Sequence, residues 1–383
     1  MSEQMERSRL LRAFTRKETV LAELLAYTEP AFVNRRFSGP VFFPLPDEPH
    51  IATWTFYLDE AEENGVFETL QEHLVQLRFP IREGISQTQD YRDATLKGSL
   101  TGGMKEATGL MLEAPQSLAL SIYQSPAGKV PVLIVANESD FQALIRALSA
   151  RNEPVPLPAS MGAAMVSGIN NWDRIRRIKA HWTASHPAGD WPAHLRQSIL
   201  PHRAMYQDKL IILSEKPYSG VPASELGLSE AQWKAQSTGL RLEHECTHFF
   251  TLRYFGCMAN HMHDELLADY MGISKVAGHF RPDWFLHFIG LENYPTYREG
   301  ARMQNYLGKP PLSPAAFAAL QELMFAATAQ VACFDQALGP ASTTADRTHR
   351  LLALCALTLE QMADERGAEA LWAAYKSGAS VKG

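Results

Sequence analysis

The stretch Ser229–Gly256, SEAQWKAQSTGLRLEHECTHFFTLRYFG, is the most informative part of this 383-residue sequence. Ser229 and Gln232 match a capping box, which starts a helix, and Gly256 suits the position just after a helix ends. Between these points apolar side chains alternate with polar ones, at Leu240, Leu242, Phe249, Phe250, Leu252 and Phe255. The pattern predicts a helix that contains His244 and His248.

Inside this helix, residues 244–248 read His-Glu-Cys-Thr-His, an HExxH motif. Helical residues four apart share a face and lie roughly 6 Å apart along the axis, so His244 and His248 can bind one tetrahedral ion. Glu245 then lies beside the ion, where it can take a proton from water that the metal activates. Cys246 points away from that face and is interpreted as a buried thiol. We therefore predict a catalytic divalent metal site with Glu245 as general base.

A catalytic zinc site needs a third protein ligand and one open position. The segment HDELLADYMG, residues 263–272, predicts a second helix on which Glu265 and Asp269 share a face. Glu265 can bind the metal, while Asp269 can accept a hydrogen bond from the outer nitrogen of a ligand histidine. The apolar residues between them would pack the two helices together. Alternative third ligands nearby are His261, His263 and Asp264.

An HExxH followed, after a short connection, by ExxxD on a second helix resembles the gluzincins, the thermolysin-like zinc metallopeptidases. The matching segment is His244–Asp269. The resemblance implies that His244, His248 and Glu265 are zinc ligands, that Glu245 is the base and that Asp269 supports a ligand histidine.

The same resemblance implies a fold. In gluzincins an α/β part precedes the motif helix and a helical part follows it, and we expect the strand Lys209–Ser214 to border the active-site cleft. The metzincin pattern is excluded, because its third histidine would fall at Tyr254.

The rest of the chain favours an α+β fold: a mixed α/β N-terminal part, an all-α C-terminal part and a zincin-like active-site helix between them. Strands are expected at Thr53–Leu58, Lys129–Asn137 and Asp208–Lys216. Helices are expected at 4–27, Glu60–Leu77, Pro314–Ala337 and Thr348–Lys376, and the Pro/Gly-rich stretch Arg151–Gly168 is expected to be a linker or substrate loop. The predicted domains are 1–155 (mixed α/β), 156–275 (catalytic core) and 276–383 (helical).

Composition excludes several classes of protein. The net charge of −6 argues against a nucleic-acid binder, which needs an excess of Lys and Arg. No stretch approaches the roughly 18 uncharged apolar residues of a membrane span, and the N-terminus lacks the apolar core of a signal peptide. Four cysteines without CxxC spacing fit a reducing compartment, so we expect a cytoplasmic protein without membrane partners.

These residues favour a soluble zinc metallopeptidase that acts on peptides or a small protein. The alternative is a non-haem Fe²⁺ oxygenase-like enzyme, because two histidines and one carboxylate also form that kind of site. A third possibility is a structural or inactive site, which the intact Glu245 disfavours. Oxyanion-stabilising candidates are Tyr297 and Arg298, with Arg302 and Tyr270 as further options.

Overall fold

The computed structural model describes residues 3–32, 36, 41–158, 160–259, 261–341 and 343–379. The chain forms two compact units. We call them the helical unit (Met1–Leu45 and Pro217–Gly383) and the sheet unit (Pro46–Lys216). They divide the chain differently from the three predicted domains: the boundary at 155 falls inside the sheet unit, and the boundary at 275 falls inside the helical unit.

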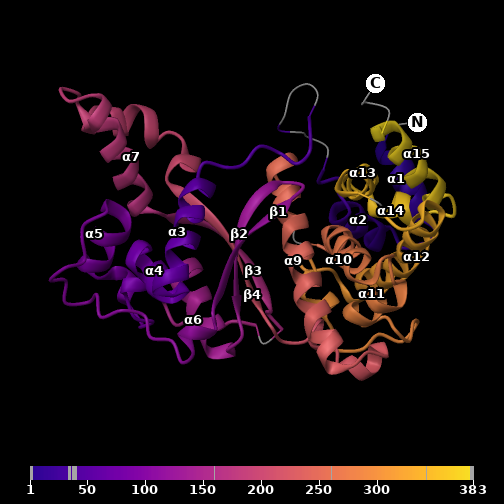
Figure 1. Ribbon diagram of the computed structural model, residues 1–383. Helices are drawn as coiled ribbons and strands as arrows, with labels where there is room; N and C mark the ends of the chain where they lie inside the picture. The colour runs from indigo at the N-terminus through magenta and orange to yellow at the C-terminus, as the bar shows by residue number, and fades with distance from the viewer. Residues whose placement is uncertain are drawn as a thin grey trace. The chain divides into compact units, whose positions relative to one another are not determined.

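A four-stranded sheet forms the centre of the sheet unit (Figure 1). Its strands are β1 (Ala119–Ser125), β2 (Gly128–Val135), β3 (Ala163–Asn170) and β4 (Gln207–Ser214), in the order β1-β2-β4-β3. The hairpin β1-β2 is antiparallel, β2 and β4 are parallel, and β3 runs antiparallel to β4. The central strands β2 and β4 are the two buried runs that the sequence predicts at Lys129–Asn137 and Asp208–Lys216, and both predictions are confirmed.

Six α-helices belong to the described part of the sheet unit: α3 (Ile51–Asn64), α4 (Val66–His73), α5 (Gln89–Lys97), α6 (Glu138–Ser149), α7 (Trp172–Ser185) and α8 (Trp191–His194). Shorter helical segments are η1 (Val75–Arg78), η2 (Ile85–Gln87), η3 (Pro115–Ser117), η4 (Leu195–Ile199) and η5 (Arg203–Met205). One hydrophobic core joins α3, α4 and α6 to the sheet, and it includes Trp54, Leu70, Leu133, Val135, Phe141, Leu144, Leu210 and Ile212.

The strand predicted at Thr53–Leu58 is wrong, because these residues lie in α3. The buried side chains of this helix, Ile51, Trp54, Tyr57 and Ala61, are three or four residues apart. That spacing places them on one helical face, so packing against the core overrides the strand propensity of the aromatic and β-branched residues. The predicted helix Glu60–Leu77 is in turn divided among α3, α4 and η1.

An ion pair lies at the centre of the sheet unit. The fully buried Asp208 is 2.6 Å from the Arg174 guanidinium, whose side chain is 3% exposed. Trp54 Nε1 donates to the Asp208 carboxylate at 2.9 Å, and Asn171 Nδ2 donates to it at 2.7 Å. These bonds attach α3 and α7 to the start of β4.

Close to this pair, His73 is held between two carboxylates. Its ring nitrogens lie 3.0 Å from Glu60 and 3.4 Å from Asp173, and its ring stacks on Tyr57. Burial alone would lower the pKa of His73, but the Asp173 and Glu60 carboxylates raise it above its ordinary value.

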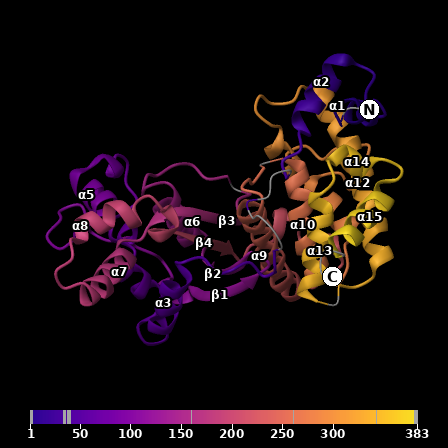
Figure 2. The ribbon, with the colours of Figure 1, turned by 90° about the horizontal axis from the view of Figure 1, so that it is seen from above.

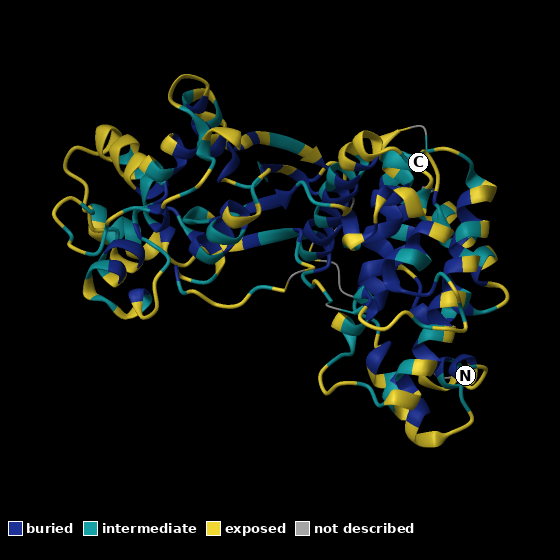
Figure 3. Cartoon of the chain, turned by 90° about the horizontal axis from the view of Figure 1, so that it is seen from below, coloured by how far each residue is buried: buried dark blue, intermediate teal, exposed yellow. Residues whose placement is uncertain are grey.

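The helical unit is built mainly of α-helices (Figure 2), and the structure describes nine of them. They are α1 (Glu3–Leu11), α2 (Glu18–Tyr27), α9 (Glu230–Tyr254), α10 (Met262–Ala277), α11 (Pro282–Ile289), α12 (Pro314–Leu338), α13 (Thr344–Cys355), α14 (Leu359–Ala363) and α15 (Gly367–Ala379). Three short 3₁₀ segments accompany them: η6 (Tyr218–Gly220), η7 (Ala223–Leu226) and η8 (Arg302–Tyr306). Buried residues fill the interior of this unit, while exposed residues lie on outer helix faces and loops (Figure 3).

Two long helices expected from the sequence are each divided. The region 4–27 forms α1 and α2, and Arg7 joins them by donating to Leu25 O at 2.8 Å and Thr28 Oγ1 at 3.1 Å. The same guanidinium lies 2.5 Å from the fully buried Glu360 carboxylate of α14. The region Thr348–Lys376 contributes to α13, α14 and α15, because a capping box at Thr358 starts a new helix.

Helix α12 begins as the sequence predicts, with Ser313 as N-cap and Pro314 at the first helical position. Among the described helices it alone is long and apolar enough to cross a membrane, and its most apolar window is 44% buried. It packs against α14, α15 and α2, so it is compatible with the core helix of a soluble protein.

The fold is therefore α+β, with a small mixed sheet in the N-terminal part and a largely helical C-terminal part, as the sequence predicts. The stretch Arg151–Gly168, expected to be a connection, contains the first part of β3, and its residue 159 lies outside the described residues. Because Lys209–Ser214 belongs to the sheet unit, its expected position beside the metal site stays a prediction.

Candidate metal centre

The motif helix α9 forms as the sequence predicts. The Ser229 side chain accepts from Gln232 N, and the Gln232 side chain accepts from Ser229 N, which completes the capping box. After the last helical residue, Tyr254, the chain reaches Gly256 with φ +82°, a left-handed conformation that glycine adopts without strain. His244 and His248 therefore lie one turn apart on a regular helix.

The second helix, α10, packs closely against α9. A Cβ atom added to Gly272 would lie 2.8 Å from the Leu240 carbonyl oxygen, so only glycine fits at this crossing. At the residue before Leu240 on α9, a Cβ on Gly239 would lie 3.1 Å from Val276, one turn after Gly272 on α10. This close approach places the acidic residues of α10 against the histidines of α9.

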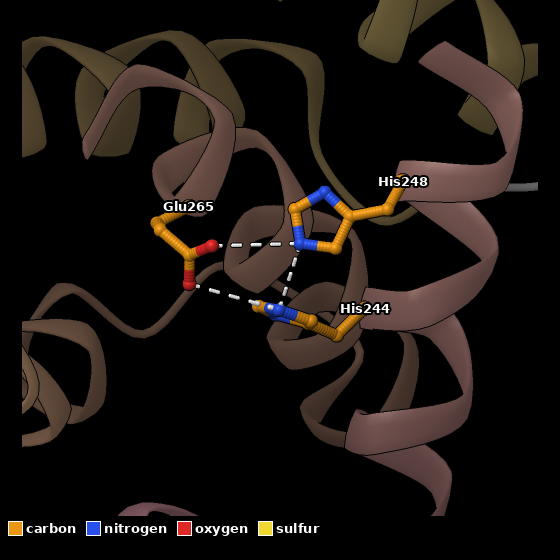
Figure 4. Close-up of side chains that lie close together, drawn as sticks. All are labelled: His244, His248 and Glu265. Carbon is orange, nitrogen blue, oxygen red and sulfur yellow. Dashed lines mark hydrogen bonds and ion pairs between the residues drawn. The ribbon is translucent and has the colours of Figure 1, made fainter. Parts of the chain in front are cut away.

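His244, His248 and Glu265 point toward one another (Figure 4). The two Nε2 atoms are 3.0 Å apart, and the Glu265 carboxylate oxygens lie 3.5 Å from His248 Nε2 and 3.7 Å from His244 Nε2. Four ligands at zinc distances of about 2.0–2.1 Å would be separated by about 3.3 Å in a tetrahedron. The two nitrogens and the carboxylate, which offer one ligand atom each within 4.8 Å of one another, are therefore close enough to bind one small cation.

The outer nitrogen of His244 has two polar neighbours. Its Nδ1 lies 2.8 Å from Asp269 Oδ1 and 2.9 Å from the Tyr218 hydroxyl, which itself donates to Asp269 Oδ1 at 2.6 Å. A carboxylate at Nδ1 keeps the proton there and leaves Nε2 free to bind a metal. Asp269 thus occupies the position that the sequence predicts for it.

Arg302, from η8, completes this arrangement. It forms an ion pair with Asp269 Oδ2, and its Nη1 donates to the Tyr218 hydroxyl at 2.6 Å. The Arg302 side chain is only 12% exposed, and its burial alone would lower the pKa. The Asp269 and Glu265 carboxylates outweigh this effect and raise the pKa of Arg302 well above the ordinary value. Arg302, a possible oxyanion stabiliser by sequence, instead holds the carboxylate that orients His244.

His248 has its own carboxylate. Its Nδ1 lies 3.2 Å from Asp264 Oδ2, and Asp264 is fully buried. Burial alone would lower the pKa of His248, but Asp264 and Glu265 raise it well above the ordinary value. Asp264, considered from the sequence as an alternative third ligand, contacts the outer nitrogen of a ligand histidine instead.

The charges around these residues favour a cation. Asp264, Glu265 and Asp269 are all buried, and Arg302 is the cation beside them, so neutral histidines leave an excess of two negative charges. Burial would raise the pKa of Glu265, yet the histidines and Arg302 lower it to about 2. Within the described residues, its buried Oε2 has no hydrogen-bond partner. A divalent ion would neutralise the excess and bind this oxygen, so the residues fit such a group.

Glu245 has a different environment from the acidic residues of α10. It is half-buried, and among the described residues no hydrogen bond or ion pair engages its carboxylate. Its neighbour Cys246 is 2% exposed, and burial raises the pKa of its thiol well above the ordinary value. The thiol is therefore buried and unreactive, as the sequence suggests.

Tyr306 lies near the cluster and, like Tyr218, is not indicated by any sequence pattern. It belongs to η8, the segment that also carries Arg302. Burial raises the pKa of its hydroxyl above the ordinary value, and the neighbouring Glu265 carboxylate raises it further. Like Tyr218, it comes from a 3₁₀ segment remote in sequence from the motif, with no periodicity to indicate it.

The structure does not bring the other candidates to the cluster. Tyr297 donates to Ala301 O at 3.0 Å, and Arg298 pairs with Glu292 at 2.6 Å. Tyr270 is fully buried and donates to Asp335 Oδ1 at 2.7 Å.

The two neighbouring histidines are also engaged elsewhere. His261 is the N-cap residue of α10 and packs on Tyr27, while the buried His263 ring contacts Phe32. Burial lowers the pKa of His263 to about 3. Among the described residues, the group able to hold a metal consists of His244, His248 and Glu265.

Comparison with known proteins places the chain in a family. Residues 9–366 match a family of unknown function, DUF7005. The chain belongs to this family. No curated protein and no solved structure is significantly similar to it. DUF7005 carries no assigned activity, so the chemistry of this member has to be argued from its own residues.

Proposed function

We propose that this DUF7005 member is a metal-dependent hydrolase, specifically a zinc metallopeptidase that cleaves peptides. The observation that carries the proposal is the convergence of His244 Nε2, His248 Nε2 and the Glu265 carboxylate within 4.8 Å of one another. This donor set, with a carboxylate beside each outer nitrogen, is typical of catalytic zinc sites that keep one position open.

Each protein group has a distinct role in this proposal. Zinc supplies Lewis-acid polarisation of water and of a substrate carbonyl. Glu245, the half-buried carboxylate without a described partner, takes the proton from the attacking water and passes it to the leaving amine. Asp269 keeps the His244 proton on Nδ1, and the Asp264 carboxylate, 3.2 Å from His248 Nδ1, favours a proton on that nitrogen by its charge. The Tyr306 hydroxyl beside Glu265 is the donor that we assign to the developing oxyanion.

The resemblance of residues 244–269 to gluzincins supports peptide bonds as the target, and Glu265 and Asp269 lie against the histidines as a ligand and a supporting carboxylate of that pattern would. We place the protein in the cytoplasm, where thiols such as the exposed Cys333 stay reduced. Fe²⁺ could occupy the same ligands, and metal identity separates this alternative from the hydrolase.

The test has two parts, on full-length protein purified without added metal. Elemental analysis should give stoichiometric zinc, and mass spectrometry should detect products from a defined peptide mixture. Glu245→Gln should retain the zinc and lose about 10²–10⁴-fold in turnover, because a general base contributes a factor of this size. Glu230→Gln, at the exposed start of the same helix, is the matched control and should leave both unchanged.

Two results would contradict the proposal. Turnover at the wild-type rate in Glu245→Gln would show that Glu245 is not the general base. Stoichiometric iron with oxygen-dependent turnover would replace the hydrolase by an oxidative enzyme.

A further inference from the structure

The sheet unit contains a cavity of its own. It has a volume of about 440 Å³ and is lined by η1, η2, α5, the end of α6, the bulged strand β3 and the start of β4. This volume lies within the range of about 300–1,000 Å³ that is typical of small-molecule sites. The residues that line the cavity all lie between Pro46 and Lys216, and none of them belongs to the His244, His248 and Glu265 cluster.

The charge of this cavity is positive in a protein whose net charge is −6. Arg92 and Arg151 both line it, and no Asp or Glu does so among the described residues. Across the described ranges neither guanidinium forms a hydrogen bond or an ion pair. Both arginines are exposed residues, and because no carboxylate shares the lining with them they give the cavity a positive charge that favours an anion.

Nearby carboxylates are committed elsewhere. Glu153 accepts from Gly84 N and Ser86 N, both at 2.9 Å, and this fixes the turn that brings η2 to the cavity. Asp93, on α5, pairs with Lys97 at 2.7 Å. Acidic residues are therefore present nearby, but they bind other groups and leave the two arginines available for a ligand.

Backbone strain is concentrated where Arg151 enters the cavity. Arg151 and Asn152 have φ values of +56° and +60°, which side-chain-bearing residues seldom adopt. The fully buried Asn152 side chain holds this conformation by donating to Gln76 O at 3.1 Å and Phe79 O at 3.0 Å, and by accepting from Tyr91 OH at 3.2 Å. Strain that the surroundings enforce in this way is typical of ligand sites.

Side-chain amides line the rest of the polar wall. Gln76 Nε2 donates to Asn170 O at 3.0 Å, and Gln207 Nε2 donates to Asn170 Oδ1 at 3.1 Å. The buried Gln76 Oε1 has no hydrogen-bond partner among the described residues. The amides are thus held in fixed orientations and offer an acceptor to a ligand that carries hydrogen-bond donors.

We propose that this cavity binds a small polar molecule through its carboxylate or phosphate group, which Arg92 and Arg151 hold while the amides contact its hydroxyl or amine groups. Carboxylate and phosphate groups both present two oxygens that can accept a pair of parallel hydrogen bonds from one guanidinium group. The size of the cavity suits a metabolite rather than a polymer.

Titration calorimetry on the full-length protein tests the proposal with two probes, glutarate as the carboxylate and ribose 5-phosphate as the phosphate. At least one probe should bind saturably below roughly 10 mM, and the tighter one identifies the anion. Arg92→Gln should weaken binding about tenfold or more, the value of one lost charge-assisted pair. Arg151→Asn should do the same, and asparagine tolerates the left-handed backbone that position 151 requires.

The matched control is Arg196→Gln, which removes an exposed arginine of the same unit that does not line the cavity. It should leave the affinity within about twofold of the wild type, because a distant surface charge is screened. The proposal is overturned if neither probe binds saturably, or if all three variants weaken binding equally.

Discussion

Replacement of Asp269 by asparagine isolates the group that orients His244. The carboxylate accepts hydrogen bonds from His244 Nδ1 at 2.8 Å and the Tyr218 hydroxyl at 2.6 Å, and it pairs with Arg302. Asparagine has the same shape but no charge, and only one of its two polar atoms accepts hydrogen bonds. In Asp269→Asn the His244 ring is therefore held less firmly, and its Nε2 becomes a weaker ligand.

The expected size of this effect follows from the bonds that are lost. A hydrogen bond to a charged group contributes about 1.5–3 kcal/mol, and loss of a carboxylate behind a ligand histidine commonly weakens metal binding by 10–100-fold. These two ranges agree, because 10–100-fold corresponds to about 1.4–2.7 kcal/mol. Since Asp269 serves both His244 and Tyr218, we expect a zinc Kd weaker by a factor near the upper limit.

Competition with a fluorescent zinc chelator measures this change. The matched control is Asp335→Asn, which removes another buried carboxylate of the helical unit, one that pairs with Arg350 at 3.1 Å and accepts from Tyr270. Both variants should lose stability, because each removes a buried carboxylate that pairs with an arginine, but only Asp269→Asn should lose zinc affinity.

Tyr218→Phe provides a milder variant that keeps every charge, and it should weaken zinc binding several-fold. Equal zinc affinities in Asp269→Asn and Asp335→Asn, with Tyr218→Phe unchanged, would refute the role that we assign to Asp269.

Three further predictions concern a helix crossing, a histidine held between two carboxylates and a buried ion pair. Gly272→Ala adds a methyl group against the Leu240 carbonyl and should cost about 1–3 kcal/mol in urea unfolding and also weaken zinc binding; an unaltered zinc Kd would mean that the crossing does not position the ligands. The pKa of His73 is raised on folding, so its contribution to stability is present below its ordinary pKa of 6.5 and is lost as pH rises through the raised value. His73→Gln should flatten that dependence in urea unfolding between about pH 6 and pH 9, and an unchanged slope would contradict it. Arg174→Met leaves the buried Asp208 uncompensated and should cost about 3–5 kcal/mol in urea unfolding; a loss below about 1 kcal/mol would show that the carboxylate is readily neutralised.

The sequence predicts the cluster of His244, His248 and Glu265 and the position of Asp269 behind it, and it misses the remaining contacts of the cluster for a physical reason. On a helix, the spacing of residues in the sequence determines which side chains share a face. The motif on α9 and the acidic pair on α10 therefore indicate which side chains lie together. Arg302, Tyr218 and Tyr306 come from η8 and η6, where no periodicity relates a residue to a distant partner. Whether Asp264 contacts the outer nitrogen of His248 or binds the metal depends on the orientation of the His248 ring, which the spacing of residues in the sequence does not determine.

In the fold, the strands buried on both faces were predictable and the edge strands were not. β2 and β4 are continuous apolar runs, whereas β1 and β3 alternate irregularly between buried and exposed residues. The segment Thr53–Leu58 has strand propensity, but it is helical because Trp54 and Tyr57 pack into the core of the sheet unit, where Trp54 Nε1 also donates a hydrogen bond to Asp208. Contacts so distant in sequence leave no local pattern.

The sheet unit interrupts the helical unit in the chain, which affects how the protein is made. On the ribosome, α1 and α2 emerge first, yet the partner of Arg7, Glu360, is translated more than three hundred residues later. The inserted sheet unit has its own core and can complete its folding while these two helices wait. Nascent chains that stop before Glu360 should therefore contain a folded sheet unit and an incomplete helical unit, and the exposed apolar surface of the helical unit would be recognised by chaperones and proteases.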